Sequence, residues 1–256
     1  MLTADPQPAT LVERSIKLLN PAVSTETRTR LVTAAMQLFW QKGYGSTSVA
    51  DVLQLAGVNS GSLYHFFPGK QDLLLAVLAL YREGMQPMLL SPAWAGVDDP
   101  IERVFALLRR YRQSIVDTDC TYGCPIGSLA LEIHEPDPPV RIALAENFKG
   151  WTDAIATCLE AAGARLPRKL NRHELAAFVL TVMEGAVMQA RTHRSVSFFD
   201  ASVRQLRAYF DHLQAEAMAT SATASKTKSV TKRASKSNTK RLRNVSASKR
   251  ARRTFK

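Results

Sequence analysis

The stretch from Ser46 to Lys70, STSVADVLQLAGVNSGSLYHFFPGK, limits the fold of this chain more than any other part of it. Ser48 can cap a helix, and the carboxylate of Asp51 can reach back to the cap, which is a variant of the capping box. Gly57 then offers the left-handed conformation that commonly ends a helix. A second short helix follows and ends at a Pro-Gly pair. Two short helices joined by a turn that contains glycine predict a helix-turn-helix.

The predicted second helix begins with short polar residues. Asn59 or Ser60 can cap it, and small side chains at its start let the backbone N–H groups approach a phosphate closely. Three side chains that can donate to phosphate oxygens come next: Tyr64, His65 and Lys70. The same pattern also fits a helical hairpin with solvated polar faces, so the residues alone leave both interpretations open.

Residues 28–80 resemble the N-terminal DNA-binding domain of the TetR family of bacterial transcription regulators. The matching residues are Ala34, Leu38, Phe39, Gly43, Tyr44, Thr47, Ser48, Val49, Leu53, Ala56, Gly57, Val58, Gly61, Ser62, Leu63, Tyr64, His65, Phe67, Lys70, Leu73 and Leu74. The resemblance implies a double-stranded DNA operator as partner. The predicted DNA-binding residues are Thr47, Ser48, Asn59, Ser60, Gly61, Ser62, Tyr64, His65 and Lys70.

The chain departs from the family pattern at three positions of this domain. Ala50 and Ser60 stand where relatives often carry a basic residue, and Phe66 stands where a second histidine is common. Each departure removes a possible DNA contact, so we expect a DNA-binding surface that is less basic than usual.

Positive charge is concentrated at the C-terminal end. The net charge is +12, from 34 Lys or Arg against 22 Asp or Glu. Thirteen of the basic residues and no acidic residue lie in residues 220–256, so the rest holds 21 basic and 22 acidic residues. This segment has almost no large apolar side chains and cannot offset its ordering entropy by burial. We predict a disordered basic tail that contacts DNA without sequence preference. A solvated solubility tail is the alternative.

Apolar residues recur at helical spacing along the rest of the chain, and no stretch alternates as a strand. We predict an all-α fold. Helices are expected at about 26–42, 70–84, 100–116, 125–134, 140–162, 171–193 and 199–219, besides the helix-turn-helix, with a loop over 86–99. The expected domains are a flexible arm (1–24), a three-helix DNA-binding domain (25–84), a helical effector-binding and dimerisation domain (85–219) and the tail (220–256).

Composition argues against several other classes of protein. No apolar run reaches the ~18–20 residues that span a membrane, and no signal pattern opens the chain, so we expect a cytoplasmic, nucleoid-associated protein without a membrane partner. Cys120, Cys124 and Cys158 suit a reducing compartment, and nothing completes a metal site around them. No phosphate loop or paired-carboxylate motif is found. We therefore predict no enzyme activity, no metal and no cofactor.

The resemblance implies that the C-terminal helices enclose a small-molecule pocket. The segment Tyr122–Gly127, YGCPIG, resembles a motif in one branch of the family. The predicted pocket residues are Phe105, Leu108, Tyr111, Cys124, Leu129, Ile133, Trp151, Ile155, Phe178 and Met183. This apolar and aromatic lining indicates a hydrophobic or aromatic effector, with Arg112, His134 or Glu184 as orienting polar groups. The alternative for each residue is ordinary core packing.

The last two helices are the candidates for a homodimer interface, which the resemblance also implies. The predicted interface residues are Leu175, Val179, Val182, Ala186, Leu206, Tyr209, Phe210 and Leu213. In a single chain the same stripes would be internal core. A dimer would present two recognition helices to successive major-groove faces, so we expect a near-palindromic operator.

Cys124 offers a different hypothesis. It precedes Pro125 and can cap a helix, where the helix dipole favours a thiolate, so a redox-sensing regulator is one alternative. A small buried thiol is the plainer interpretation. The predicted function is a sequence-specific transcriptional regulator, a homodimeric repressor released from its operator by a small effector. The rival is an architectural DNA-binding protein dominated by its tail.

Overall fold

The computed structural model describes residues 26–134 and 137–223. The predicted arm and nearly all of the predicted tail lie outside these residues. The described chain divides into two compact units: one holds the residues up to Ala162 together with Asn171–Arg207, and the other holds Gly163–Leu170 and the residues from Ala208 onward. The first unit contains both the predicted DNA-binding domain and most of the predicted effector domain.

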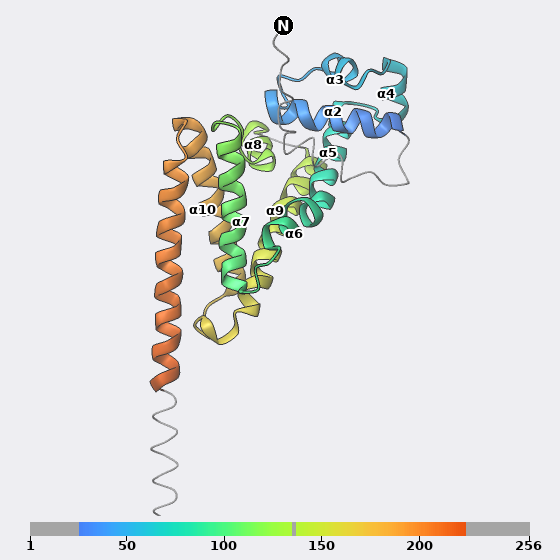
Figure 1. The fold of residues 1–256 in the computed structure, drawn as a ribbon. Helices are drawn as coiled ribbons and strands as arrows, with labels where there is room; N and C mark the ends of the chain where they lie inside the picture. Colours follow the sequence, from blue (N-terminus) through green and yellow to red (C-terminus); the bar gives the residue numbers. More distant parts are fainter. Residues whose placement is uncertain (1–25, 135–136, 224–256) are drawn as a thin grey trace, which may run out of the picture. The chain divides into compact units, whose positions relative to one another are not determined.

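The described residues form helices and no strands, which confirms the all-α prediction (Figure 1). The N-terminal helices are α2 (Glu26–Lys42), α3 (Val49–Ala56), α4 (Ser60–Phe66) and α5 (Lys70–Gly84). The longer helices of the body are α7 (Pro100–Asp117), α9 (Pro138–Ala161) and α10 (Arg172–His193), with the short α8 (Pro125–Glu132) between α7 and α9. Residues 197–223 are also helical. Helices α2, α3 and α4 contact one another, and α5 packs against α2 and α9.

The expected loop over 86–99 is wrong. A π-helical turn, Met85–Leu90, continues α5, and α6 (Ser91–Trp94) follows it. The two prolines of this segment suggested breaks, but Pro87 lies in the first turn of the π-helix and Pro92 near the start of α6. Both prolines lie inside the continuous helical stretch Lys70–Trp94, where the π-helical turn changes the hydrogen-bond pattern around Pro87. Within the segment 86–99, only residues 95–99 are non-helical.

Two other helices have limits that differ from the predicted ones. Helix α9 begins at Pro138, two residues earlier than expected, because a proline is well tolerated in a first turn. The last helix begins at residue 197 and is still helical at residue 223, so four residues assigned to the tail extend it. The other predicted helix limits agree within about two residues, the usual uncertainty of such boundaries.

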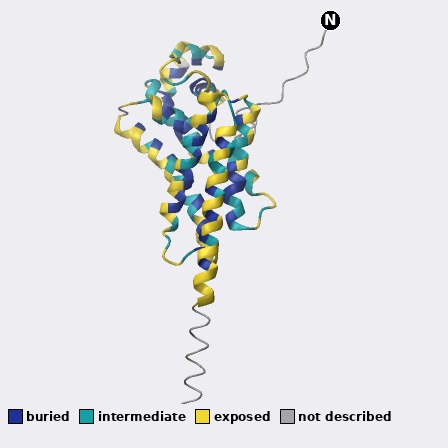
Figure 2. Cartoon of the chain, turned by 90° about the vertical axis from the view of Figure 1, so that its left-hand side faces the viewer, coloured by how far each residue is buried: buried dark blue, intermediate teal, exposed yellow. Residues whose placement is uncertain are grey.

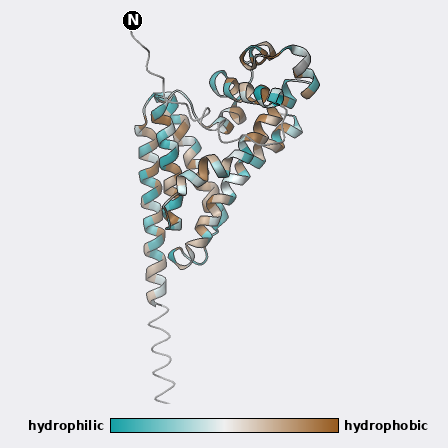
Figure 3. Cartoon of the chain, turned by 45° about the vertical axis from the view of Figure 1, so that its right-hand side comes forward, coloured by the Kyte–Doolittle hydropathy of each residue, from teal (hydrophilic) through white to brown (hydrophobic). Residues whose placement is uncertain are grey.

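Apolar residues are buried on the inner sides of the packed helices, while exposed residues cover their outward faces (Figure 2). Single helices accordingly carry both hydrophobic and hydrophilic surfaces (Figure 3). One buried cluster joins the core of the N-terminal helices, including Leu31, Phe39 and Leu74, to Ile126 and Leu129 of α8. The N-terminal helices and α8 therefore share a hydrophobic core.

The helical stretch Lys70–Trp94 is long and apolar enough, by length and composition alone, to cross a membrane. An 18-residue window within it has a mean hydropathy of 1.3. The sequence-based expectation concerned an uninterrupted apolar run, and Arg82 and Glu83 interrupt this stretch. Within the protein, Leu73, Leu74, Val77 and Leu78 of this stretch are buried in the shared core, as in an ordinary core helix.

Candidate nucleic-acid interface

Helix α3 is held at both ends by the local interactions that the sequence indicates. The Ser48 hydroxyl accepts the Asp51 backbone N–H (3.0 Å), and the Asp51 carboxylate accepts the Ser48 backbone N–H (2.8 Å). The capping box is thus confirmed. Gly57 ends the helix in the left-handed conformation, with φ 63°. The Ser48 backbone N–H and then the Ser48 hydroxyl donate to the Asp51 carboxylate, and these two hydrogen bonds lower the pKa of Asp51.

Helix α4 presents a polar face to solvent and is anchored from below by two apolar side chains. Leu63 and Phe67 are buried. The exposed residues at and after its start include Asn59, Ser60, Gly61, Tyr64 and His65. Tyr64 is 59% exposed, which is high for an aromatic side chain in a folded domain. Ser62 lies within the helix. This arrangement leaves the side chains of Asn59, Ser60, Tyr64 and His65 accessible to a DNA groove.

Two predicted DNA-binding residues lie elsewhere. Thr47 is 1% exposed, and its hydroxyl donates to the carbonyl of Gly43 (2.7 Å). Its observed role is to hold the turn before α3, which differs from the expected DNA contact. Lys70 is half-buried, with Nζ 4.2 Å from the centroid of the Tyr44 ring. Burial lowers the pKa of Lys70, and the nearby Glu132 carboxylate opposes that shift.

Two arginines of α2 contact the helix-turn-helix. Arg30 donates to the carbonyl oxygens of Ala56 and Gly57, the latter at 2.8 Å. The guanidinium of Arg28 lies 5.3 Å from the centroid of the Phe67 ring. A cation at the carbonyl end of a helix is favourable, so Arg30 ties α3 to α2. Contacts across 26 residues leave no local signal.

Most predicted effector-pocket residues lie inside the helical body. Seven are buried: Phe105, Leu108, Cys124, Leu129, Trp151, Ile155 and Met183. Tyr111 and Ile133 are half-buried, and the Tyr111 ring lies 5.1 Å from that of Trp151. Phe178 is not brought to this interior, because it is 47% exposed on α10.

A group of polar side chains lies in the interior around Cys124. The thiol caps α8 through the N–H of Gly127 (3.5 Å), as the sequence suggested. Burial, and then the charge of Glu184, raise the pKa of Cys124 far above its usual range. Burial also raises the pKa of Glu184 and of Tyr111. The thiolate that the redox hypothesis requires is therefore disfavoured, because the effects of burial and of Glu184 exceed those of the hydrogen bonds from the Gly127 and Ile126 N–H groups.

Arg112 and His134, the other two predicted orienting groups, differ from Glu184 in their hydrogen bonding or exposure. Arg112 donates to both oxygens of Asp200, at 2.7 and 3.0 Å, so its guanidinium is held by this residue. His134 is exposed two residues after the end of α8. Glu184 keeps one buried oxygen, Oε1, without a hydrogen-bond partner. Of the three, only Glu184 directs unsatisfied hydrogen-bonding capacity into the body.

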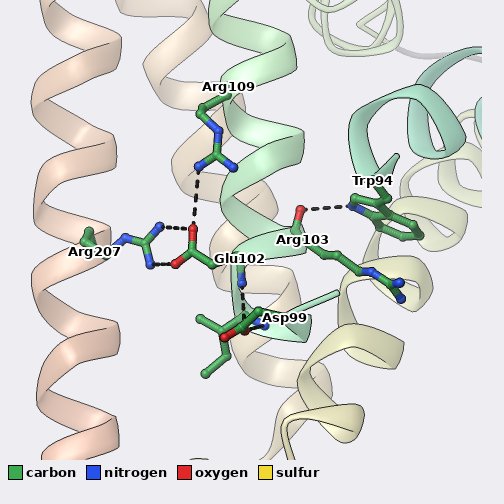
Figure 4. A network of polar contacts seen from close by, with 7 residues as sticks. Trp94, Asp99, Glu102, Arg103, Arg109 and Arg207 are labelled. Carbon is green, nitrogen blue, oxygen red and sulfur yellow. Dashed lines mark hydrogen bonds and ion pairs between the residues drawn. The ribbon is translucent and has the colours of Figure 1, made fainter. Parts of the chain in front are cut away.

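A network of polar contacts fixes α7 in the body (Figure 4). The Glu102 carboxylate accepts hydrogen bonds from both terminal nitrogens of Arg207, and the bond from Nη2 is 3.0 Å long. A terminal nitrogen of Arg109 lies 3.6 Å from the same carboxylate. The hydrogen bonds from Arg207, more than its charge, lower the pKa of Glu102. The indole of Trp94 donates to the carbonyl of Arg103 (2.9 Å) and so joins α6 to α7. Nothing in this network resembles a catalytic arrangement.

The predicted dimer residues are mostly buried within the single chain. Leu175, Val179, Ala186, Leu206, Phe210 and Leu213 are buried, Val182 is half-buried, and Tyr209 is 41% exposed. On α10 the exposed large apolar side chains are Phe178 and Met188. Val182 and Gly185 lie between them at helical spacing. A Cβ atom at Gly185 would meet no other atom within 4 Å.

The fold and the exposed α4 define a helix-turn-helix DNA-binding regulator. Residues 31–77 match the family model for bacterial regulatory proteins of the tetR family, and residues 100–205 match that for the LmrA/YxaF-like transcriptional regulator C-terminal domain. The chain is 34% identical over 185 residues to the HTH-type transcriptional regulator Rv0196 of Mycobacterium tuberculosis, covering 70% of this chain and 92% of that protein.

More distant relatives agree. The HTH-type transcriptional repressor DhaR of Mycobacterium sp. (strain GP1) is 27% identical over 174 residues, covering 67% of this chain and 85% of DhaR. The crystal structure of regulatory protein TetR from Rhodobacter sphaeroides matches with a TM-score of 0.64 at 26% identity, covering 71% of this chain and 97% of that one. The chain belongs to the TetR family and is a DNA-binding transcriptional regulator. Such regulators act in the cytoplasm.

Proposed function

We propose that this protein is a homodimeric repressor that binds a near-palindromic operator through α4 and is released by a small hydrophobic or aromatic effector. The observation that carries the proposal is the exposed polar face of α4, backed by the buried Leu63 and Phe67. Repression is supported by the relative DhaR, whose name describes a repressor.

Tyr64 and His65 are the strongest candidates for side-chain contacts to DNA, because both are exposed on α4. Asn59, Ser60 and Gly61 are exposed at its start and are short enough for the backbone to approach the groove. Ser48 is exposed at the cap of α3 and completes the set. Since these residues carry little positive charge, affinity in this region depends on hydrogen bonds to bases and phosphates more than on charge.

The exposed apolar stripe of α10 supports a homodimer. Phe178, Val182, Gly185 and Met188 recur at helical spacing on one side of α10. An exposed apolar surface of this kind is typical of a protein interface, and a glycine within it allows close approach of a second helix. The exposed stripe is a better candidate than Leu175, Val179 and Ala186, whose apolar surface is already buried within the chain.

The interior of the body supports an effector with an apolar or aromatic frame. Tyr111 and Trp151 supply aromatic surface, and Tyr111 lies near Cys124 and Glu184. Phe105 adds a further buried aromatic ring in the body. Glu184, with its unpartnered oxygen, is the residue that would orient a hydrogen-bond donor on the effector. Binding that favours a DNA-incompetent arrangement would lower operator affinity by shifting the population.

Selection of binding sites from random duplex DNA tests the proposal. A near-palindromic consensus with two half-sites is expected. Tyr64→Ala should weaken binding to that consensus by about tenfold, the usual cost of one lost contact of this kind. Phe198→Ala is a matched control, because Phe198 is also an exposed aromatic residue and lies on a different helix. Recovery of unrelated sequences would instead support the architectural rival.

The basic tail is the main support for that rival. Removing residues 221–256 should weaken binding to consensus and random DNA by similar factors and flatten the salt dependence, because lysine and arginine contacts to phosphates release counterions. Titrations at several salt concentrations measure both effects. A loss confined to the consensus would contradict this role and would assign the tail to sequence recognition.

A further inference from the structure

The carboxylate of Glu132 binds the turn that precedes the helix-turn-helix. Glu132 is the last residue of α8, and its two oxygens accept the backbone N–H groups of Tyr44 (2.8 Å) and Gly45 (2.6 Å). Gly43, just before them, has φ 87°. Successive N–H groups that converge in such a turn form a small anion-binding nest, and here the anion is a side chain of the same protein.

The turn fits this carboxylate closely. A Cβ atom at Gly43 would lie 2.8 and 2.9 Å from the two Glu132 oxygens, and one at Gly45 would lie 3.0 Å from the nearer oxygen. Any other residue at Gly43 would also strain the backbone, because its φ is in the left-handed region. The carboxylate of Glu132, a residue of the body, therefore lies so close to this turn of the DNA-binding domain that Gly43 and Gly45 leave no room for a larger side chain.

Helix α8 contacts the same part of α2 from its other end. The indole of Trp40 donates to the carbonyl of Gly123 (3.0 Å), and its ring lies 4.5 Å from that of Tyr122. Between these two attachments Ile126 and Leu129 are buried in the core shared with the N-terminal helices. Trp40 and Glu132 therefore join α8 to the end of α2 and to the turn that leads into α3.

The opposite side of α8 is fixed by α10. A Cβ atom at Gly127 would collide with the Glu184 carboxylate, and one at Gly123 would lie 3.1 Å from a methyl group of Val187. Because α10 leaves α8 so little space, α8 is a firm support for Glu132. Lys70 lies on the Tyr44 ring and within the field of Glu132, so the same carboxylate also acts on a predicted DNA-contacting residue.

From these contacts we propose that Glu132 is a positioning residue for operator recognition, whose carboxylate fixes the turn at Tyr44 and Gly45 and so holds α3, α4 and Lys70 in the DNA-binding arrangement. The inference rests on the proposed operator binding. Glu132 itself does not contact DNA. Without it the two N–H groups would bond water, the turn would move more freely, and a smaller fraction of the protein would be ready to bind.

The proposal predicts an effect opposite in sign to that of simple charge. Removing a negative charge near a DNA-binding surface should strengthen binding by electrostatics alone. If Glu132 positions the turn, Glu132→Ala should instead weaken binding to the selected operator, by about tenfold when two charge-assisted hydrogen bonds are lost. Glu132→Gln keeps one acceptor oxygen and should lie between Glu132→Ala and the unchanged protein.

The matched control is Glu146→Ala. Glu146 is also an exposed glutamate, on α9, and pairs with Arg82 without touching the turn. Operator affinity of this variant should stay within about twofold, as for most exposed ion pairs. Thermal unfolding of all variants separates a loss of affinity from a loss of folded protein, because a purely structural role would lower the melting temperature and leave the affinity of the folded fraction unchanged.

The deciding experiment combines operator titration with hydrogen exchange at single amides in the full-length protein without DNA. The expected result is weaker operator binding by Glu132→Ala, a partial effect of Glu132→Gln, and faster exchange of the Tyr44 and Gly45 amides in Glu132→Ala. Equal or tighter binding by Glu132→Ala, or unchanged exchange at both amides, would overturn the proposal. Failure of the unchanged protein to prefer the operator would refute the proposed function, while the exchange result would still test the turn.

Discussion

Helices α3 and α8 each have eight residues and a capping side chain at the start, but they are positioned in different ways. Ser48, Asp51 and Gly57 hold α3 within one short segment of sequence. Cys124 likewise caps α8 within its own segment, through the N–H of Gly127, but Glu132 at the other end binds the α2–α3 turn, 88 residues away in sequence. The caps of α3 are thus local, although Arg30 of α2 adds a contact at its C-terminal end. Glu132 at the end of α8 instead makes tertiary contacts that tie the body to the DNA-binding domain.

The largest expected effect on stability comes from a substitution in α8, where it packs on the N-terminal helices. Leu129→Ala removes a side chain that is 2% exposed in the core shared by α8 and the N-terminal helices. It should lower the free energy of unfolding by about 2–4 kcal/mol, because it leaves a cavity. Urea denaturation measures the change. Leu131→Ala in the same helix is the control, since Leu131 is 67% exposed and should change stability by less than about 0.5 kcal/mol. Similar losses in both variants would show that α8 is not anchored as described.

A smaller effect is expected at the end of α3. Gly57→Val places a branched side chain at φ 63°, and its Cβ atom would lie 2.8 Å from the Arg30 guanidinium. We expect a loss of about 1–3 kcal/mol in the free energy of unfolding, because the left-handed conformation is strained for such residues. Gly61→Ala is the control, since Gly61 has no left-handed φ and its Cβ atom would meet only Asn59, at 3.4 Å. Chemical denaturation of both variants tests this, and unchanged stability of Gly57→Val would contradict the described turn.

The cap of α3 should contribute less. Ser48→Ala removes the acceptor of the Asp51 N–H and leaves that group to solvent. The expected loss is about 1 kcal/mol in the free energy of unfolding. Ser48→Asp, which can still accept at this position, should recover most of it. An alanine variant as stable as the unchanged protein would mean that the capping box adds nothing.

The smallest expected effect is on the pH dependence of stability, in which the cap of α3 (Asp51) and the cap of α8 (Cys124) should differ. The pKa of Asp51 is lower in the folded protein than in the unfolded chain. Asp51 therefore adds to the free energy of unfolding at pH values above its unfolded pKa, and this stabilisation is lost as the pH falls through its folded pKa. The pKa of Cys124 is raised, so its contribution is present below the unfolded pKa of about 8.5 and is lost as the pH rises. By pH 9 this loss should be about 0.8 kcal/mol.

Stability of the unchanged protein and of Cys124→Ser, measured from pH 7 to 9, tests the alkaline part. The serine variant should show a smaller decline, because its hydroxyl does not ionise in this range. Cys158 also has a raised pKa and remains in both proteins, so the difference between the curves isolates Cys124. Parallel curves would contradict the buried, protonated thiol.

The same contrast explains what the sequence could predict. The helix-turn-helix, its capping box and the left-handed Gly57 were predictable because their partners lie within a few residues. The interior location of most effector candidates followed from their spacing along helices. The partners of Arg30, Trp40 and Glu132 were not predictable, since contacts made 26 to 88 residues away leave no pattern in one sequence. The burial of Thr47 was missed although its hydroxyl bonds Gly43 only four residues away, because a single sequence does not show whether this side chain faces the core or the solvent.

The most direct test of the account is the affinity of the full-length protein for its selected consensus in the presence of excess random duplex DNA. The result predicted is that the protein stays on the consensus against competitor, and that it still does so after removal of residues 221–256, with lower affinity for both DNAs. Loss of the consensus complex to competitor, with and without the tail, would contradict sequence-specific recognition by α4.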